Sequence, residues 1–232
     1  MQTNRKNGIK KVVDVLMTVL LLCLMAYQVT GETLHEFGGI AMTVLLVVHH
    51  ILNFKWYKSL FKGKYNAYRV VTVAVNTLLL ASISLTALCG MAMSSHAVPF
   101  LYGMLPVSFA RRFHLAMSFW SFILMGLHLG FHLPAMTAKV KPGKAWEIVL
   151  SSIFSIFAGI GLWLFIRNGI SEYITFRTHF AFFDYDKAVA LVFLENLAIE
   201  FFFVFVGANI VRLIRILKRK QQEKKNQCLC GL

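Results

Sequence analysis

Long apolar stretches follow one another along the chain, separated by short polar segments. Six of them are near 20 residues, the length at which a helix rising 1.5 Å per residue crosses a hydrocarbon core of about 30 Å. They cover residues 12–30, 34–54, 70–93, 113–133, 147–166 and 188–213. Because lipid satisfies no backbone polar group, such spans are helices. The pattern predicts an all-α, polytopic membrane bundle of about six helices.

The connections are short, which predicts one membrane domain over residues 1–217 and a disordered, basic cytoplasmic tail over 218–232. The first stretch has a basic start, as a signal peptide does. Its exit "YQVTGETL" is a poor small-residue cleavage site, so we expect an uncleaved first helix.

The net charge of +14 is distributed unevenly. Nineteen of the 24 Lys and Arg residues flank alternate apolar stretches. They are Arg5, Lys6, Lys10, Lys11, Lys55, Lys58, Lys62, Lys64, Arg69, Lys139, Lys141, Lys144 and the seven from Arg212 to Lys225. A nucleic-acid surface does not need this alternation. The positive-inside rule explains it and predicts that both termini are cytoplasmic.

Histidines interrupt two of the spans. "LHEFGGIAMTVLLVVHHILNFKW" carries His35 and His49, and "RRFHLAMSFWSFILMGLHLGFHLP" carries His114 and His128. Both pairs are fourteen positions apart. On a helix this interval is about 1400° of rotation and about 21 Å of rise. Each helix therefore presents two imidazoles on one face, one toward each membrane surface.

The charge pattern predicts that these two helices are parallel, so the histidines pair by depth: His35 with His114 near the outer surface, and His49 with His128 near the inner one. Two imidazoles facing each other in a bundle are suitable axial ligands for haem iron. No C-x-x-C-H motif is present for covalent attachment. The sequence predicts two non-covalent b-type haems between the second and fourth spans. Bis-His ligation leaves no open iron position and favours electron transfer.

Other histidines leave the inner ligands open. His50 is rotated about 100° from His49, and His132 lies one turn beyond His128, so either is an alternative inner ligand. His96 and His179 fall in outer loops, where we expect solvated or hydrogen-bonded side chains.

Two other classes of protein remain as alternatives. The same histidines would suit a divalent-metal or proton transporter, or the chain would be a non-catalytic anchor of a redox complex.

Small and basic residues near the histidines are further candidates for cofactor contact. Gly38 and Gly126 would let a flat macrocycle approach a helix, although glycines also serve ordinary helix–helix contact. Arg111 and Arg112 lie just outside His114, where they would bind haem propionates. An interfacial anchor pair is the alternative for both arginines.

Polar residues inside the last span pose a separate question. Glu195, Asn196 and Glu200 would carry protons or bind a quinol headgroup near the outer surface, or form a structural hydrogen bond. Asp14 and Asn76 raise the same question more weakly.

Other features carry less information. The outer segment "NGISEYITFRTHFAFFDYDK" is aromatic, and would cover the outer haem, dock a partner or form an interfacial belt. Cys23 and Cys89 fall within spans and are expected to pack. Cys228 and Cys230 lie in the basic tail.

The H-x13-H helices resemble the transmembrane di-haem cytochromes b, such as ferric reductases and respiratory cytochrome b subunits. More closely, "LHEFGGIAMTVLLVVHHILNFKWY" and "HFAFFDYDKAVALVFLENLAIEFFFVFVG" resemble the bacterial flavinylation-associated cytochrome family. The resemblance covers most of residues 12–217. It implies a haem subunit of the bacterial inner membrane that exchanges electrons with extracytoplasmic proteins bearing covalent FMN. The electron donor would be cytoplasmic or a quinol, with a quinone as an additional cofactor. No nicotinamide-binding G-x-G-x-x-G follows a strand in these residues, so we expect an electron conduit.

Overall fold

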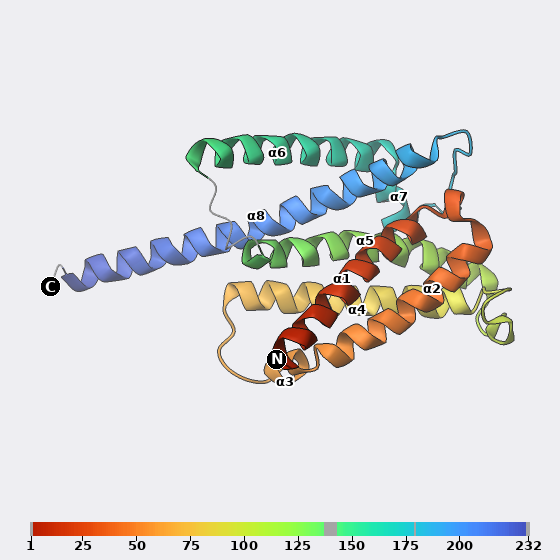
Figure 1. The fold of residues 1–232 in the computed structure, drawn as a ribbon, viewed down its shortest axis with the longest axis horizontal. Coiled ribbons are helices and arrows are strands. Elements are labelled where there is room, and N and C mark those ends of the chain that lie inside the picture. Colours follow the sequence, from red (N-terminus) through yellow and green to blue (C-terminus); the bar gives the residue numbers. More distant parts are fainter. Residues whose placement is uncertain (1, 137–142, 179, 231–232) are drawn as a thin grey trace.

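The computed structural model describes residues 2–136, 143–178 and 180–230, and every element in these ranges is helical (Figure 1). The elements are α1 (Gln2–Met25), α2 (Tyr27–Leu52), α3 (Lys55–Leu60), α4 (Ala67–Met91), η1 (Pro99–Leu101), α5 (Val107–Met136), α6 (Lys144–Arg167), α7 (Ile170–Ile174) and α8 (Val189–Cys230). The predictions for Lys139, Lys141 and His179 lie outside the described residues, as do those for the side chains of Arg5, Lys6, Lys144, Cys228 and Cys230.

Five of these helices are long and apolar enough to cross a membrane, which confirms the prediction of a helical, multi-pass membrane protein. Their membrane-spanning ranges are Tyr27–Leu52, Ala67–Met91, Val107–Pro134, Trp146–Arg167 and Val189–Glu223. The helix α1 differs because Lys10, Lys11 and Asp14 interrupt its apolar sequence. A sixth span through α1 therefore stays a prediction.

The chain turns between α1 and α2 at Ala26, a fully buried residue. The sequence pattern placed this turn near residues 31–33. Gly31, at the edge of that region, does break the helical geometry of α2, with φ of 69° and ψ of 176°, a conformation that favours glycine. The helix α2 then runs back along α1, so the two form an antiparallel hairpin (Figure 1).

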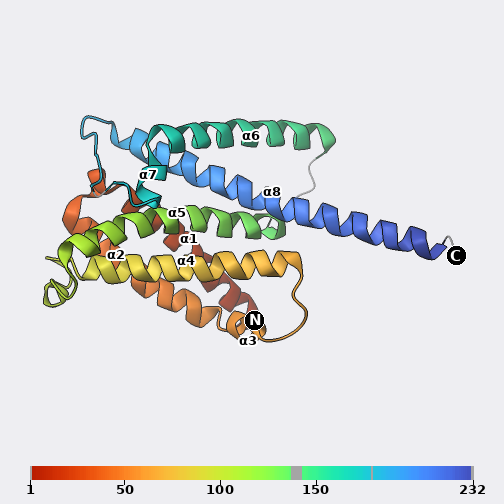
Figure 2. The same cartoon turned by 180° about the vertical axis from the view of Figure 1, so that it is seen from behind.

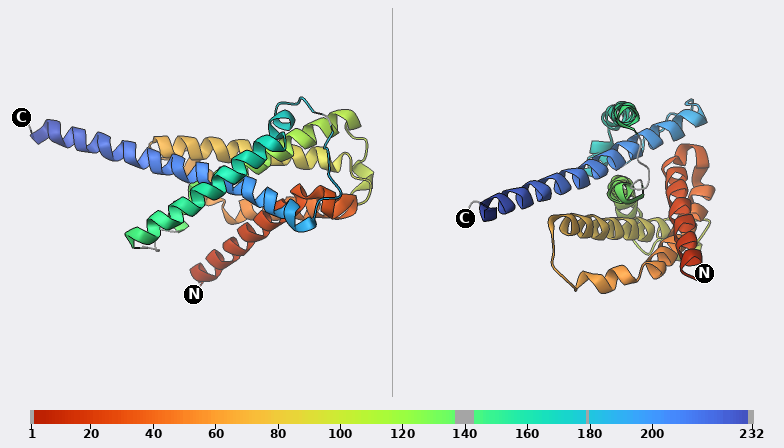
Figure 3. Two further views of the ribbon diagram at one scale, coloured as in Figure 1. Left: turned by 90° about the horizontal axis from the view of Figure 1, so that it is seen from above. Right: turned by 60° about the vertical axis from the view of Figure 1, so that its left-hand side comes forward.

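The helix α5 lies at the centre of the bundle, between α4 and α8 (Figure 2). Fully buried side chains fill this region, including Phe122 and Ile199. The helix α6 packs on the far side of α8 and crosses it obliquely (Figure 3). The helix α2 packs mainly on α1 and only sparsely on α4. The two histidine-bearing helices, α2 and α5, therefore belong to different layers of the bundle.

Each end of the bundle has its own set of connections. The starts of α1, α4 and α6 and the end of α8 lie toward one end, and the α1–α2, α4–α5 and α6–α8 connections lie at the other (Figure 1). The described basic clusters thus gather at one end, as the alternating pattern predicts.

The helix α8 continues without a break to Cys230 and extends beyond the bundle (Figure 1). The tail predicted to be disordered is thus helical over the described residues 218–230. Lys, Arg, Gln and Glu are good helix formers, and Arg219 pairs with Glu223 one turn later, with Nε and Oε1 3.3 Å apart. The charged composition that suggested disorder also continues a helix.

A glycine allows the close approach of α6 and α8. A Cβ atom built at Gly161 would lie 2.1 Å from the Ala198 carbonyl oxygen, whereas one at Gly159 meets nothing within 4 Å. We predict that Gly161→Ala lowers the stability of the bundle by about 1–3 kcal/mol, the usual cost of overpacking. Thermal unfolding in detergent measures this effect. Gly159→Ala is the matched control on the same helix, and equal melting temperatures for the two variants would contradict the packing described.

Candidate functional site

Two histidines from different layers meet near the end of the bundle that holds the α4–α5 connection. His35 on α2 and His114 on α5 have ring centroids 5.9 Å apart, with an interplanar angle of 74°. An imidazole nitrogen binds a metal at about 2.0–2.1 Å, and the ring centre lies about 1 Å behind that nitrogen. Two axial imidazoles on one metal therefore have centroids about 6 Å apart. The observed separation fits this arrangement, and it brings together the two residues predicted to form the outer pair.

The helix α4 holds the ring of His114 from behind. His114 Nδ1 lies 2.9 Å from the Thr86 carbonyl oxygen. A carbonyl only accepts, so Nδ1 carries the proton and Nε2 keeps its lone pair. Gly90 lies against the same ring, because a Cβ atom there would be 3.0 Å from His114 Cε1. The hydrogen bond to Thr86 fixes the tautomer of His114, and together with the packing against Gly90 it fixes the ring orientation. Metal ligation through Nε2 requires both.

His35 has a different environment. Its Nδ1 atom is buried and has no hydrogen-bond partner among the described residues. The Leu24 backbone carbonyl faces the ring without meeting hydrogen-bond geometry. The Tyr27 ring packs edge-on against His35 with centroids 5.0 Å apart. A buried imidazole nitrogen without a partner is costly, and it marks His35 as a side chain whose interactions are incomplete.

The second level of histidines lies toward the opposite end of the bundle. His128 Nδ1 on α5 lies 2.8 Å from Asn76 Oδ1 on α4. His49 Nδ1 on α2 lies 2.8 Å from Asp14 Oδ1 on α1. In both cases the acceptor oxygen assigns the proton to Nδ1 and leaves Nε2 as the basic nitrogen. His49 is close enough to His128 to interact with it electrostatically.

The alternative inner ligands lie beside this pair. The His49 and His50 ring centroids are 5.5 Å apart, and those of His128 and His132 are 4.8 Å apart. His50 Nδ1 lies 2.7 Å from the hydroxyl of Tyr57, and burial raises the pKa of that phenol. His132 is exposed. The structure groups all four histidines, and the choice between them stays a prediction.

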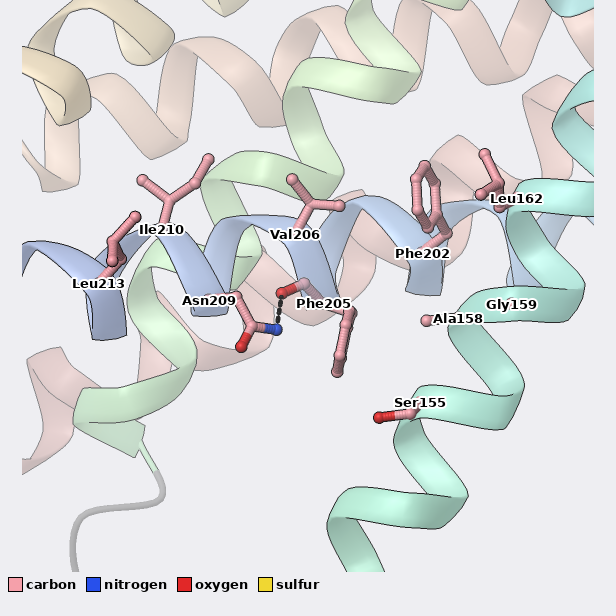
Figure 4. A pocket seen from close by; sticks show the side chains of 10 residues that line it. All are labelled: Ser155, Ala158, Gly159, Leu162, Phe202, Phe205, Val206, Asn209, Ile210 and Leu213. Atoms are coloured by element: carbon pink, nitrogen blue, oxygen red, sulfur yellow. Dashed lines mark hydrogen bonds between the residues drawn. The ribbon is translucent and has the colours of Figure 1, made fainter.

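An apolar hollow of about 410 Å³ adjoins His50 between α2 and α4. It is lined by Leu46, Val47, His50, Phe54, Tyr57 and Leu80, among others. A second hollow of about 410 Å³ lies between α6 and α8 (Figure 4). Its polar side chains are Ser155 and Asn209. The Asn209 amide donates a hydrogen bond to the Phe205 carbonyl oxygen at 2.8 Å. No histidine lines this second hollow, so it is separate from the candidate site.

The supporting residues of α4 were not recognised as a set from the sequence, although their spacing was available. Asn76 contacts His128 and Gly90 contacts His114. These two positions on α4 are fourteen residues apart, as the two histidines on the antiparallel α5 are. The same fourteen-residue interval thus occurs on α4, and it is the sequence feature that would have identified the α4 residues contacting the histidines.

Gly38 and Gly126, predicted to contact a cofactor, pack against neighbouring helices, and the two arginines predicted to do so lie on the surface. A Cβ atom at Gly38 would be 3.1 Å from a Leu24 methyl group on α1, and one at Gly126 would be 2.6 Å from Phe203 Cβ on α8. These are helix–helix contacts, which was the alternative interpretation. Arg111 and Arg112 are exposed, and Arg112 lies over the Phe176 ring at 5.7 Å. The proposed roles of all four residues toward a cofactor stay predictions.

The polar residues of α8 separate into two cases. The Glu195 carboxylate is buried and pairs with Lys187 Nζ at 2.6 Å and with the Asn168 amide at 3.3 Å. Glu195 thus makes structural hydrogen bonds, which was the alternative to proton transfer or quinol binding. Glu200 is 4% exposed, and neither carboxylate oxygen has a hydrogen-bond partner among the described residues.

The aromatic segment that follows α6 covers the His35–His114 end of the bundle in part. Tyr173 stacks on Phe119 with centroids 4.7 Å apart, and Phe183 stacks on Tyr27 at 5.4 Å. Phe182 is 84% exposed. The segment thus packs through some rings and presents others outward, and its docking role stays a prediction.

A carboxylate fixes the α4–α5 connection to α2. Glu36 follows His35 and accepts hydrogen bonds from Ser94 Oγ at 2.6 Å and from the backbone amides of Ser95, His96 and Ala97 at 2.8–3.0 Å. Glu32, Glu36 and His96 also offer ligand atoms within 4.8 Å of one another. Because the Glu36 oxygens already bind protein donors, we assign Glu36 a structural role.

Comparison with known proteins adds no family or fold assignment: no family model, curated protein or solved structure matches the chain.

Replacement of Glu36 tests whether its hydrogen bonds to residues 94–97, called here the Glu36 clamp, hold the α4–α5 connection to α2. We predict that Glu36→Gln lowers stability by about 1–3 kcal/mol, because hydrogen bonds to charged groups contribute more than neutral ones and the amide leaves some donors unmatched. The control is Glu32→Gln on the exposed side of the same helix turn, for which we expect almost no change. Thermal unfolding of both variants in one detergent compares them directly. A larger loss for Glu32→Gln would refute this role.

Proposed function

We propose that this protein is a membrane electron-transfer cytochrome that binds two b-type haems. His35 and His114 hold one haem iron, and His49 and His128 hold the other. The observation that carries the proposal is the state of the imidazoles: three of the four have Nδ1 bound to an acceptor, which leaves Nε2 as the metal-binding nitrogen. The fourth, His35, is half-buried, its buried Nδ1 has no hydrogen-bond partner among the described residues, and its ring lies opposite His114 at the separation expected of two imidazoles on one metal.

In this proposal, side chains and backbone groups of the chain bind the candidate histidines and orient their rings. Thr86 and Asn76 on α4 hold the two α5 histidines, and Asp14 on α1 holds His49. The bound haem supplies one-electron Fe³⁺/Fe²⁺ chemistry, and two imidazoles per iron favour electron transfer over oxygen binding. The two levels are separated along α5 by about 21 Å of helix rise, so together they would span the hydrocarbon core.

The direction of insertion and the partners also belong to the proposal. Basic residues at one bundle end favour a cytoplasmic location for both termini. Together with the family resemblance, this favours the bacterial inner membrane, a cytoplasmic or quinol donor and an extracytoplasmic partner bearing FMN. Arg111 and Arg112 lie in the same turn as His114, where they would meet propionates.

A divalent-metal or proton transporter is less well supported by the same residues. A transport path needs carboxylates and open coordination along its length. Glu36, which follows His35, is bound by protein donors, and Asp14, which contacts His49, orients that ring. The anchor alternative predicts that replacing His35 or His128 leaves the electron flow of the redox complex intact.

A visible spectrum and a haem assay of the purified protein test the proposal. We expect reduced-minus-oxidised bands of haem b and about two haems per chain, since two bis-imidazole sites are available. His35→Ala should remove one haem and retain the other, because it deletes an axial ligand of only one site. His128→Ala should remove the other haem. His96→Ala, on an exposed loop histidine, is the matched control and should retain both.

Two results would sink the proposal. One is a folded, monodisperse wild-type sample with no haem b after expression in a haem-sufficient host. The other is loss of both haems in every single variant, including His96→Ala. Loss of the second haem in His50→Ala but not in His49→Ala would replace His49 by its neighbour as the ligand.

A further inference from the structure

The four candidate ligands differ in the group that accepts the Nδ1 proton. His114 donates to a neutral backbone carbonyl, and His128 donates to a neutral side-chain amide. His35 has no acceptor in hydrogen-bond geometry. His49 alone donates to a carboxylate, that of Asp14, at 2.8 Å. The two levels of the site therefore differ by one negative charge placed directly on a ligand.

A carboxylate acceptor changes the donor strength of an imidazole. It attracts the Nδ1 proton, which moves electron density toward Nε2 and makes that nitrogen a stronger base. A more basic axial ligand, and the nearby negative charge, stabilise the oxidised metal more than the reduced metal. Hydrogen bonding to axial ligands is one of the means by which proteins set haem potentials. The effect lowers the reduction potential of the site that contains His49.

The other charges near the two sites do not cancel this difference. Glu36 lies near His35 and keeps its negative charge, but its oxygens accept from Ser94 Oγ and from the backbone amides of Ser95, His96 and Ala97, and no candidate imidazole ligand donates to it. The groups that interact electrostatically with His128 are His132, His49, His50 and Asp14, and Asp14 is the only acid of the four. Lys10 lies one turn before Asp14, and its ammonium group donates a hydrogen bond to Asn53 Oδ1 at 2.8 Å.

We propose that Asp14 is a positioning residue that makes the His49–His128 site the lower-potential one. One electron would then pass downhill from a haem held by His49 and His128 to one held by His35 and His114; the first would be oxidised, the second would be reduced, and no bond would form or break. This inference rests on the proposed function, and it adds a direction of flow. With the termini in the cytoplasm, electrons would move from the cytoplasmic side outward.

Asp14 is accessible to mutation without loss of a packed core contact, since its side chain is 47% exposed. Asp14→Asn keeps the size and removes the charge. The wild-type protein should show two midpoint potentials in a spectroscopic redox titration. The His35→Ala background, which keeps only the His49–His128 site, should retain the lower one.

In that background Asp14→Asn should raise the remaining potential. We expect a change of about tenfold in the electron-transfer equilibrium, equal in size to the smaller effect that groups orienting metal ligands have on metal affinity; tenfold corresponds to 59 mV for one electron. In the His128→Ala background, which keeps the other site, the same substitution should leave the potential unchanged.

Asn76→Asp is the reciprocal variant, because it places a carboxylate on His128 of the same site. It should lower the potential of the His49–His128 site. This variant also decides the matter if Asp14→Asn fails to retain haem at that site.

The outcomes separate the two proposals. Absence of haem from the wild-type protein defeats the proposed function. Two haems with the higher potential at the His49–His128 site overturn the inference on Asp14 alone. So does an Asp14→Asn potential that is unchanged or lower, or an Asn76→Asp potential that is unchanged or higher.

Discussion

An imidazole placed inside an apolar bundle has two ring nitrogens to satisfy, and an unsatisfied buried nitrogen is costly. For three of the four candidate histidines, the neighbouring helices α1 and α4 bind Nδ1 and leave Nε2 unbound. The helix α4 binds His114 through the Thr86 carbonyl and His128 through Asn76, and α1 binds His49 through Asp14. The positions of α1 and α4 thus orient three of the four histidines on α2 and α5.

The same constraint links the register of four helices. The histidines repeat at fourteen residues on α2 and α5, and their contacts on α4 repeat at the same interval. A shift of α4 by one residue would rotate its contacts by about 100° away from both rings. The Glu36 clamp holds the α4–α5 connection against α2 and so fixes the height of His114 relative to His35. Electron transfer would depend on these heights, because they set the distance between the two sites.

The apolar pattern predicted the class of fold and most of the spans, since the lengths of such segments follow from membrane thickness. It also predicted the His35–His114 contact, because helical spacing and parallel direction are enough to pair residues by depth. It placed the reversal near residues 31–33, where Gly31 does break the helix, but it missed the additional turn at the buried Ala26, because an alanine in an apolar run does not mark a helix end. It also missed the helical tail, because helix-forming charged residues resemble a disordered composition.

Contacts between helices were the least predictable part. Gly38 and Gly126 lie against Leu24 and Phe203, and a sequence shows that a residue is small without showing what it faces. Asp14 and Asn76 were recognisable as polar residues in apolar segments. Their partners depend on which helices are neighbours, and a hydropathy pattern does not give helix adjacency.

The central claim is that the facing imidazoles bind iron in pairs. Electron paramagnetic resonance of the oxidised, purified protein tests it most directly, because two strong axial imidazoles make ferric haem low-spin. The account predicts low-spin ferric haem at two distinct sites, with little high-spin signal. A folded protein that contains haem with a predominantly high-spin signal would contradict it, since that result means an axial position is not held by histidine.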